Sequence, residues 1–160
     1  MNRREFGGLI LGAVAGLSTG VGSLYASPTT KSKINWEKTL RTAHDASLEQ
    51  SKPLLMIFGA SWCTFCHKLH RETLTDPSLA ALINREFVPL ALDFDKETRV
   101  VEILEVEQLP CTIVLSSEAD LLLKYVGFLK PDAYLKKLQS ALAKQKEIQL
   151  TKGTAPGRQR

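Results

Sequence analysis

The stretch ASWCTFCHKLH, residues 60–70, holds two cysteines and two histidines within about three helical turns. Two cysteines separated by two residues, as Cys63 and Cys66 are, suit three kinds of site. They can form a redox-active disulfide, carry a c-type haem when a histidine follows, or ligate a metal ion together with histidine. The residues around the stretch have to decide among these three chemistries.

The residues that precede the cysteines favour a redox dithiol. PLLMIFGA, residues 53–60, is a continuous apolar run, typical of a strand buried on both faces, and we expect a helix to begin at the cysteines. In the first turn of a helix, free backbone N–H groups and the helix dipole favour negative charge. Cys63 is therefore predicted to be the attacking thiolate, and Cys66, one turn further on, to resolve the mixed disulfide.

Hydrophobic periodicity and helix-start signals predict the other elements. We expect helices over 34–52, from Asp76-Pro77, over 96–106 and from Pro131-Asp132, and strands over 88–94, 111–115 and 121–126, the last two forming a hairpin. This alternation predicts an α/β fold, with a central mixed β-sheet that has helices on both faces.

Three features together resemble the thioredoxin superfamily: WCTFC after an apolar strand, Leu109-Pro110 before another strand, and Gly127 before the last helix. Within it, KPLLMIFGASWCTFCHKL, TLTDPSLAALI and FVPLALDFD are similar to the thioredoxin-like domain of periplasmic thiol:disulfide interchange reductases. The resemblance runs from Trp36 to Leu142 and implies a thioredoxin fold. It also implies a cis peptide before Pro110, placed against the dithiol, where the backbone of Leu109 would pair with an extended substrate segment.

The function expected on this basis is that of a thiol:disulfide oxidoreductase acting on protein disulfide and dithiol substrates. Trp62 and Phe65 would form an apolar rim that receives the substrate. We expect no dissociable cofactor. The resemblance further implies a membrane thiol reductant carrier as electron partner, and reduction as the direction of the reaction.

The sequence departs from thioredoxin itself near the dithiol. Thr64-Phe65 stands between the cysteines in place of Gly-Pro, Ile57 stands where a buried acid is usual, and Ala91 where its lysine partner is usual. The usual proton acceptor for the resolving thiol is therefore missing. His67, next to Cys66, is a possible modulator that could replace this acceptor, or it is a solvated surface residue. His70 is expected at the surface.

Cys111 directly follows Pro110 and leaves three interpretations open. It is a small buried strand residue, a third redox partner of Cys63 or Cys66, or a member of a Cys₃His metal site with Cys63, Cys66 and His67. Two further alternatives concern the whole protein. CTFCH also fits a c-type haem carrier with His67 as axial ligand, and the fold could serve as a thioredoxin-like binding or chaperone module with an incidental dithiol.

The two ends of the chain differ from its middle. Residues 1–26 place two arginines before a glycine-rich apolar run, which predicts a twin-arginine-like export signal; an ordinary secretory signal and an uncleaved membrane anchor are the alternatives. Each predicts a periplasmic or other extracytoplasmic location. Residues 27–33 are a predicted linker, 34–142 the domain, and 143–160 a basic, disordered tail. Because the excess of Lys and Arg that makes the net charge +4 lies at the ends, a nucleic-acid footprint is not expected.

Overall fold

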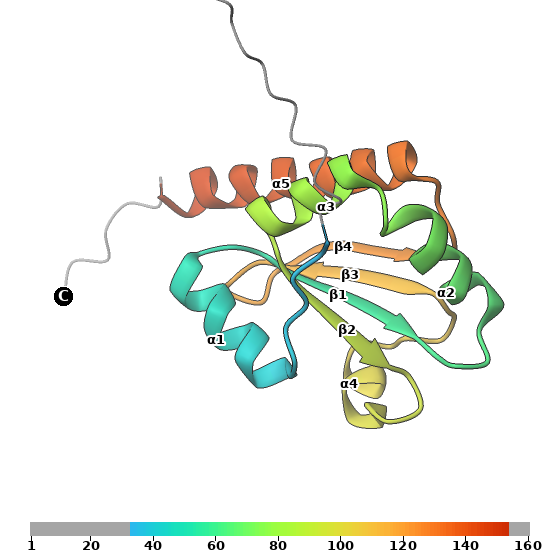
Figure 1. The fold of residues 1–160 in the computed structure, drawn as a ribbon. Helices are drawn as coiled ribbons and strands as arrows, with labels where there is room; N and C mark the ends of the chain where they lie inside the picture. Colours follow the sequence, from blue (N-terminus) through green and yellow to red (C-terminus); the bar gives the residue numbers. More distant parts are fainter. Residues whose placement is uncertain (1–32, 154–160) are drawn as a thin grey trace, which may run out of the picture.

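A four-stranded sheet forms the centre of the protein in the computed structural model, which describes residues 33–153 (Figure 1). The strand order is β2-β1-β3-β4. The strands are β1 (Leu54–Gly59), β2 (Val88–Asp93), β3 (Cys111–Leu115) and β4 (Leu121–Val126). The edge strand β2 pairs with β1 in parallel, whereas β1–β3 and β3–β4 are antiparallel. The mixed sheet and the terminal hairpin are therefore confirmed.

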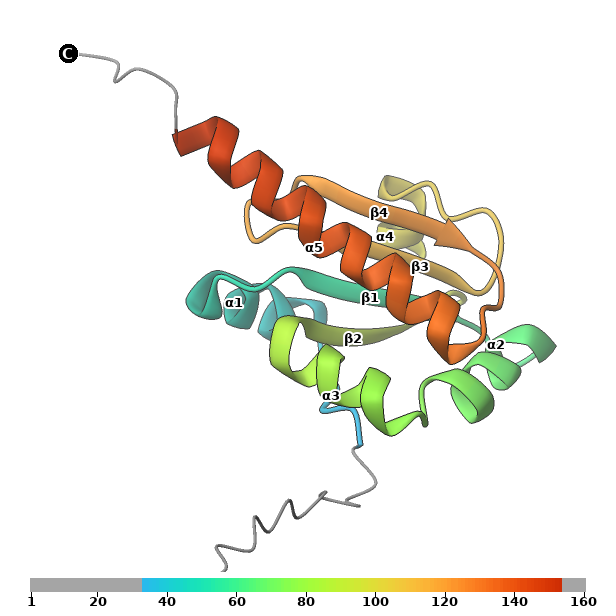
Figure 2. The same cartoon turned by 90° about the horizontal axis from the view of Figure 1, so that it is seen from above.

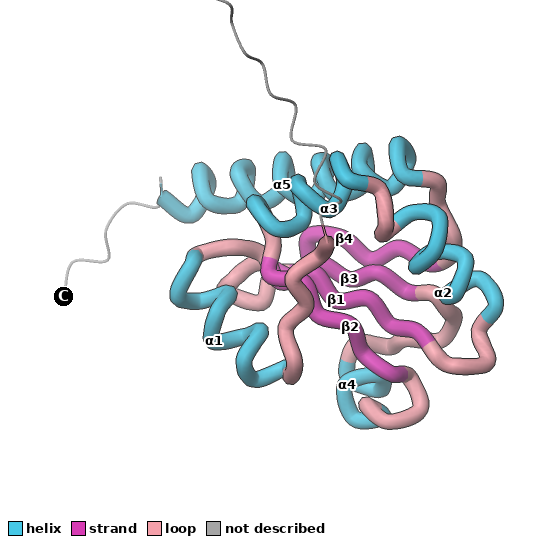
Figure 3. Tube along the Cα trace, in the orientation of Figure 1, coloured by secondary structure: helices cyan, strands magenta, loops and turns pink. Residues whose placement is uncertain are grey.

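Helices cover both faces of the sheet, as predicted. One layer consists of α3 (Pro77–Glu86) and α5 (Pro131–Gly153), and the other of α1 (Leu40–Gln50) and α4 (Thr98–Ile103) (Figure 2). The short helix α2 (Thr64–Lys68) continues into a π-helical turn, η1 (Leu69–Thr73), beyond the carboxyl end of β1. The tube in Figure 3 shows how the strand, the loop and α2 follow one another at this edge of the sheet.

Strand β1 contributes to both cores, which explains its unbroken apolar sequence. Leu55 and Ile57 belong to the cluster that contains residues of α3 and α5. Met56 and Phe58 belong to the cluster on the opposite face, with residues of α1 and α4. All four side chains are buried, so the strand contributes apolar burial to folding on both of its faces.

Helix α1 begins later than the sequence pattern predicts. The expected helical start at Ile34 is wrong, because the backbone N–H of Glu37 instead donates a hydrogen bond to the carbonyl of Pro89, at 2.8 Å, along the edge of β2. Thr39 then caps the helix, and its Oγ1 accepts the backbone N–H of Thr42 at 3.1 Å. Pairing with a distant strand outweighs the local helical spacing here.

Helix α5 continues far beyond the predicted end of the domain. The predicted disorder from residue 143 is wrong as far as Gly153, because the helix keeps a face toward the protein. Ala141 and Gln145 are buried, and Ile148 packs against the core cluster that also contains residues of α3. The polar composition of this segment gave no sign of these contacts with residues distant in the chain.

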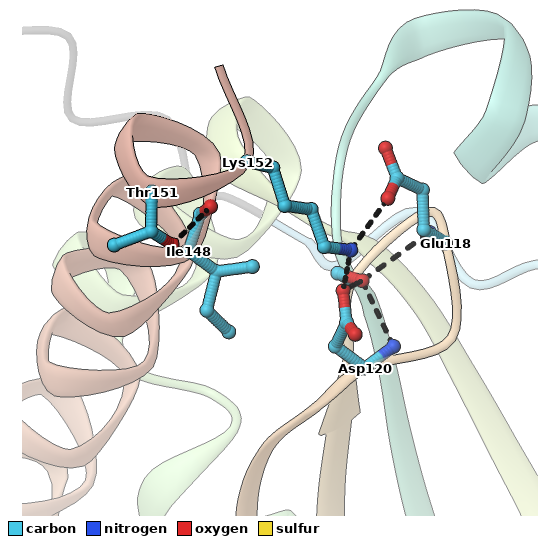
Figure 4. A network of polar contacts seen from close by, with 6 residues as sticks. Glu118, Asp120, Ile148, Thr151 and Lys152 are labelled. Carbon is cyan, nitrogen blue, oxygen red and sulfur yellow. Dashed lines mark hydrogen bonds and ion pairs between the residues drawn. The ribbon is translucent and has the colours of Figure 1, made fainter. Parts of the chain in front are cut away.

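The end of α5 is held to the turn between β3 and β4 by a charged network (Figure 4). Lys152 Nζ lies 2.6 Å from Glu118 Oε2 and 2.7 Å from Asp120 Oδ2. The hydroxyl of Ser116 donates to the same Asp120 oxygen at 3.0 Å and accepts the Asp120 backbone N–H. The network thus fixes both the hairpin turn and the helix end.

Three predicted segments lie wholly or partly outside the described residues. These are the export signal, the linker except for its last residue, and the final seven residues of the tail. Within residues 33–153, no helix has the length and hydropathy of a membrane span.

Candidate active site

The two cysteines sit where β1 passes into α2. Cys63 is the N-cap residue of α2, and its Sγ accepts the backbone N–H of Cys66 at 3.1 Å. The two sulfurs are bonded in a disulfide, with the Cα atoms 5.3 Å apart. The predicted helix start at the cysteines is confirmed. In the reduced protein the same N–H group and the helix terminus would stabilise a thiolate on Cys63.

Apolar side chains surround the disulfide. Cys63 and Cys66 are 6% and 4% exposed, and Ala60, Phe94 and Leu109 complete their cluster. The peptide bond from Leu109 to Pro110 is cis, which confirms that prediction. The structure therefore brings the predicted substrate-binding segment, with Leu109, directly against the dithiol.

The predicted apolar rim is exposed beside the disulfide. Trp62 and Phe65 have 65% and 59% of their surface exposed. The indole Nε1 of Trp62 donates a hydrogen bond to Asp95 Oδ2 at 2.9 Å, and its ring meets Phe94 edge-on, with ring centroids 6.5 Å apart. Large exposed aromatic surface of this kind is suited to contact with another molecule.

Phe94 and Asp95 are site residues that the sequence analysis missed. They follow the last residue of β2, which runs parallel to β1. The carboxyl ends of neighbouring parallel strands meet at one edge of a sheet, so residues after β2 come close to residues after β1. The apolar run of β2 followed by an aromatic and an acidic residue was the signal that could have identified them.

Neither histidine is bound to a sulfur of the dithiol in the described part of the chain. His67 is exposed, and its Nε2 lies 2.8 Å from the carbonyl oxygen of Ser61. Because a carbonyl only accepts, Nε2 carries the proton in this contact. The ring of His70 lies 6.3 Å from that of Trp36, and partial desolvation, with a smaller contribution from His67, lowers the pKa of His70.

Cys111 lies in a different cluster from the disulfide. It is a free, fully buried thiol on β3, packed with Met56, Phe58 and Ile113 on the α1–α4 face of the sheet. Burial raises the pKa of Cys111, against a smaller opposing effect of Lys124. Among residues 33–153, no three His, Cys, Asp or Glu side chains are grouped to hold a metal ion, so the Cys₃His hypothesis finds no support in the geometry.

Ile57 and Ala91 are direct neighbours in the register of β1 and β2. Ile57 is buried in the core and Ala91 is exposed at the edge strand. The sequence analysis named these two positions as those of the missing acid and its lysine partner. Their pairing shows that two non-titrating residues stand side by side at these two positions.

Comparison with known proteins identifies the family of this chain. The profile of a thioredoxin-like domain matches residues 40–142. The thioredoxin-related protein DsbJ of Chlamydia pneumoniae is 30% identical in an alignment of length 97. The match covers 53% of this chain and 28% of DsbJ, so this chain spans well under half of that relative.

Two solved structures have the same fold at low sequence identity. The DsbH oxidoreductase superimposes with a TM-score of 0.67 at 20% identity, covering 78% of this chain and 95% of DsbH. The oxidised C-terminal domain of Neisseria meningitidis DsbD gives a TM-score of 0.55 at 20% identity, covering 64% of this chain and 92% of that domain. With its matched profile, its fold and the Cys63–Cys66 disulfide, the chain belongs to the thioredoxin-like domain family and is a thioredoxin-like redox protein.

Proposed function

We propose that this protein is an exported thiol:disulfide oxidoreductase that reduces disulfides in other proteins. The observation that carries the proposal is the position of the dithiol. Cys63 Sγ lies at the amino end of α2, within hydrogen-bond distance of a backbone N–H, and Cys66 closes a disulfide with it. A thiolate stabilised in this way is a good nucleophile and a good leaving group.

In the reducing direction, the Cys63 thiolate attacks one sulfur of a substrate disulfide. A mixed disulfide forms and the other substrate sulfur leaves as a thiolate. Cys66, as a thiolate, then attacks Cys63 Sγ, which closes the Cys63–Cys66 disulfide and releases the second substrate sulfur. Two electrons pass from the dithiol to the substrate, and a second dithiol must supply two electrons to reset the site.

The surface around the dithiol suits a protein substrate. Trp62 and Phe65 offer exposed apolar area, and Leu109, in the segment that leads into β3, packs against the cluster of the two cysteines. An extended substrate segment could hydrogen-bond to the backbone of Leu109 while its side chains contact the aromatic rim. The likeness to Dsb proteins and the arginines of the N-terminal segment support a periplasmic location, with a membrane thiol carrier as reductant.

The test is the redox equilibrium of the domain against glutathione and dithiothreitol, read by alkylation and intact mass. A reduction potential of about −270 mV for the Cys63–Cys66 couple supports a reductase. A reduction potential of about −120 mV makes the protein an oxidant and overturns the proposed direction. A Soret band in protein made with haem-attachment machinery would overturn the dithiol assignment. Equal rescue of client proteins by the wild type and a Cys63→Ser, Cys66→Ser variant would indicate a chaperone module.

A further inference from the structure

The hydrophobic cluster that holds Cys66 within residues 33–153 supplies no group that could take its proton. Its other members are Ala60, Cys63, Phe94 and Leu109, none of which is a base while Cys63 is in a mixed disulfide. In the register of β1 and β2, Ile57 pairs with Ala91, and neither of these side chains titrates. Yet Cys66 must lose its proton before it can resolve a mixed disulfide, since the thiolate is the nucleophile.

The charged and titratable groups on the flanking segments are engaged elsewhere or face outward. On α2, His67 donates to the Ser61 carbonyl, and Lys68 lies over the ring of Phe128, 4.6 Å from its centroid. Asp93, the last residue of β2, forms an ion pair with Lys96, and Asp95, two residues later, accepts a hydrogen bond from Trp62. Ahead of Leu109, Glu107 is exposed.

An opening beside Cys66 exists because residue 59 is glycine. A β-carbon at Gly59 would lie 3.5 Å from Cys66 Cβ and 3.6 Å from Cys66 Sγ. Apart from its chain neighbours, no other atom of the described residues would come within 4 Å of that carbon, and Gly59 is itself partly exposed. The position of the absent side chain therefore borders the Cys66 side chain. The register partner of Gly59 on β2 is Asp93, whose carboxylate contacts Lys96 and accepts the Asp95 backbone N–H.

We propose that Cys66 gives its proton directly to solvent across this opening, and that Gly59 is a positioning residue that keeps the opening clear. The inference rests on the proposed dithiol function and concerns its second step. A water molecule or a buffer base takes the Cys66 proton. The Cys66 thiolate attacks Cys63 Sγ, the bond from Cys63 to the substrate sulfur breaks, and the departing substrate thiolate takes a proton from solvent.

The resolving step can be measured alone with a chromogenic aromatic disulfide. In a Cys111→Ser background, the reduced protein reacts with dithiobis(nitrobenzoate) in two phases. The first forms the mixed disulfide on Cys63, and the second, independent of reagent concentration, is the attack by Cys66. A Cys66→Ser variant that lacks the second phase assigns it. If the Cys111→Ser protein with its intact Cys63–Cys66 pair shows no second phase, the proposed function fails, and not merely this inference.

The decisive variant is Gly59→Ala, with Ala91→Val as the control on the neighbouring strand. The Gly59 backbone does not have the left-handed φ that disfavours alanine, and contacts of 3.5–3.6 Å are ordinary, so the fold should persist. The added methyl displaces solvent from the sulfur. We expect the second phase to slow by about three- to tenfold near neutral pH, as a rise of about half a unit to one unit in the pKa of Cys66 would produce. Its pH midpoint should move up, while Ala91→Val changes neither quantity.

Buffer dependence separates solvent from an internal base. At constant pH, the second-phase rate of the wild type should rise with buffer concentration, and restoring the missing pair as Ile57→Asp, Ala91→Lys should abolish that rise. The proposal is overturned if Gly59→Ala leaves both rate and pH midpoint unchanged. It is also overturned if His67→Gln, Asp95→Asn or Glu107→Gln alone slows the second phase tenfold or more, since that residue would then be the base.

Discussion

The phenol of Tyr134 and the hydroxyl of Thr112 meet at 2.9 Å in the interior, and they join α5 to the centre of β3. Both residues are buried, Tyr134 at 1% exposure and Thr112 at 2%. Thr112 follows Cys111 and the cis bond at Pro110, so this hydrogen bond ties the last helix to the segment that carries the predicted substrate-binding backbone.

Removal of the Tyr134 hydroxyl group should destabilise the fold by leaving the Thr112 hydroxyl without this partner. For Tyr134→Phe we expect a loss of about 1–3 kcal/mol in the free energy of unfolding, measured by urea denaturation. The double variant Tyr134→Phe, Thr112→Val should recover part of the loss, because both polar groups are then gone. Equal stability of Tyr134→Phe and the wild type would show that the hydrogen bond contributes nothing.

The Tyr134 side chain should also make the free energy of unfolding decrease at high pH. Burial raises the pKa of Tyr134 well above its usual value, while the hydrogen bond from Thr112 opposes this with a smaller effect. The unfolded chain loses the tyrosine proton near about pH 10 but the folded one retains it, so this contribution to stability is present below that pH and is lost above it. Absorbance at 295 nm should show one tyrosine that ionises only on unfolding, and Tyr134→Phe should remove that signal.

The Cys111 thiol should not react with alkylating reagents or take part in thiol exchange while the protein is folded. It is fully buried, and burial raises the pKa of its thiol, so little thiolate forms near neutral pH. After reduction, peptide mapping should find the Cys111 thiol unmodified by an alkylating reagent in native buffer and modified only in denaturant. Cys111→Ala should retain the exchange kinetics of the wild type; loss of activity there would revive the interpretation of Cys111 as a redox partner.

The charged network at the end of α5 should stabilise the helix in a pH-dependent way. The hydrogen bond from Lys152, with one from Ser116, holds the pKa of Asp120 below its usual value. The contribution is therefore present above the ordinary carboxyl range and is lost as the pH falls through the lowered pKa. Lys152→Met should lower the urea midpoint at neutral pH and low salt, and the difference should vanish in acid or high salt.

Lys146→Met is the matched control for that experiment. Lys146 is exposed on the same helix and has no ion pair among the described residues. Its loss should leave the urea midpoint within the scatter of the wild type at every pH. If both variants lower the midpoint equally, the effect comes from net charge and not from the contacts with Glu118 and Asp120.

The contact between Trp62 and Asp95 should control substrate engagement more than stability. Without its carboxylate acceptor, the exposed indole becomes free to change rotamer. For Asp95→Ala, in a Trp36→Phe background that leaves one tryptophan, we expect lower fluorescence anisotropy and slower reduction of a protein disulfide. The unfolding free energy should change by no more than about 0.5 kcal/mol. An unchanged anisotropy would show that the hydrogen bond does not hold the ring.

Local sequence signals were enough to predict the parts of the site that lie within one strand, turn or helix start. The apolar run over 53–60 predicted β1 because a strand buried on both faces must be apolar at every position. Asp76 before Pro77 predicted the start of α3, where Asp76 Oδ1 accepts the Leu79 N–H. The dithiol at the strand-to-helix junction followed from the same kind of local pattern.

The amino-acid sequence by itself determined the order of the strands and main helices and the dithiol at the start of a helix, and its resemblance to the thioredoxin superfamily implied the cis peptide before Pro110. Tertiary structure decided what depends on partners distant in the chain: Glu37 pairs with β2, α5 extends to meet Glu118 and Asp120, and Asp95 reaches Trp62. It also decided that Cys111 lies in a different hydrophobic cluster from the dithiol. The physical reason is that hydrophobic periodicity and capping act over a few residues, whereas sheet register decides which distant side chains share a face.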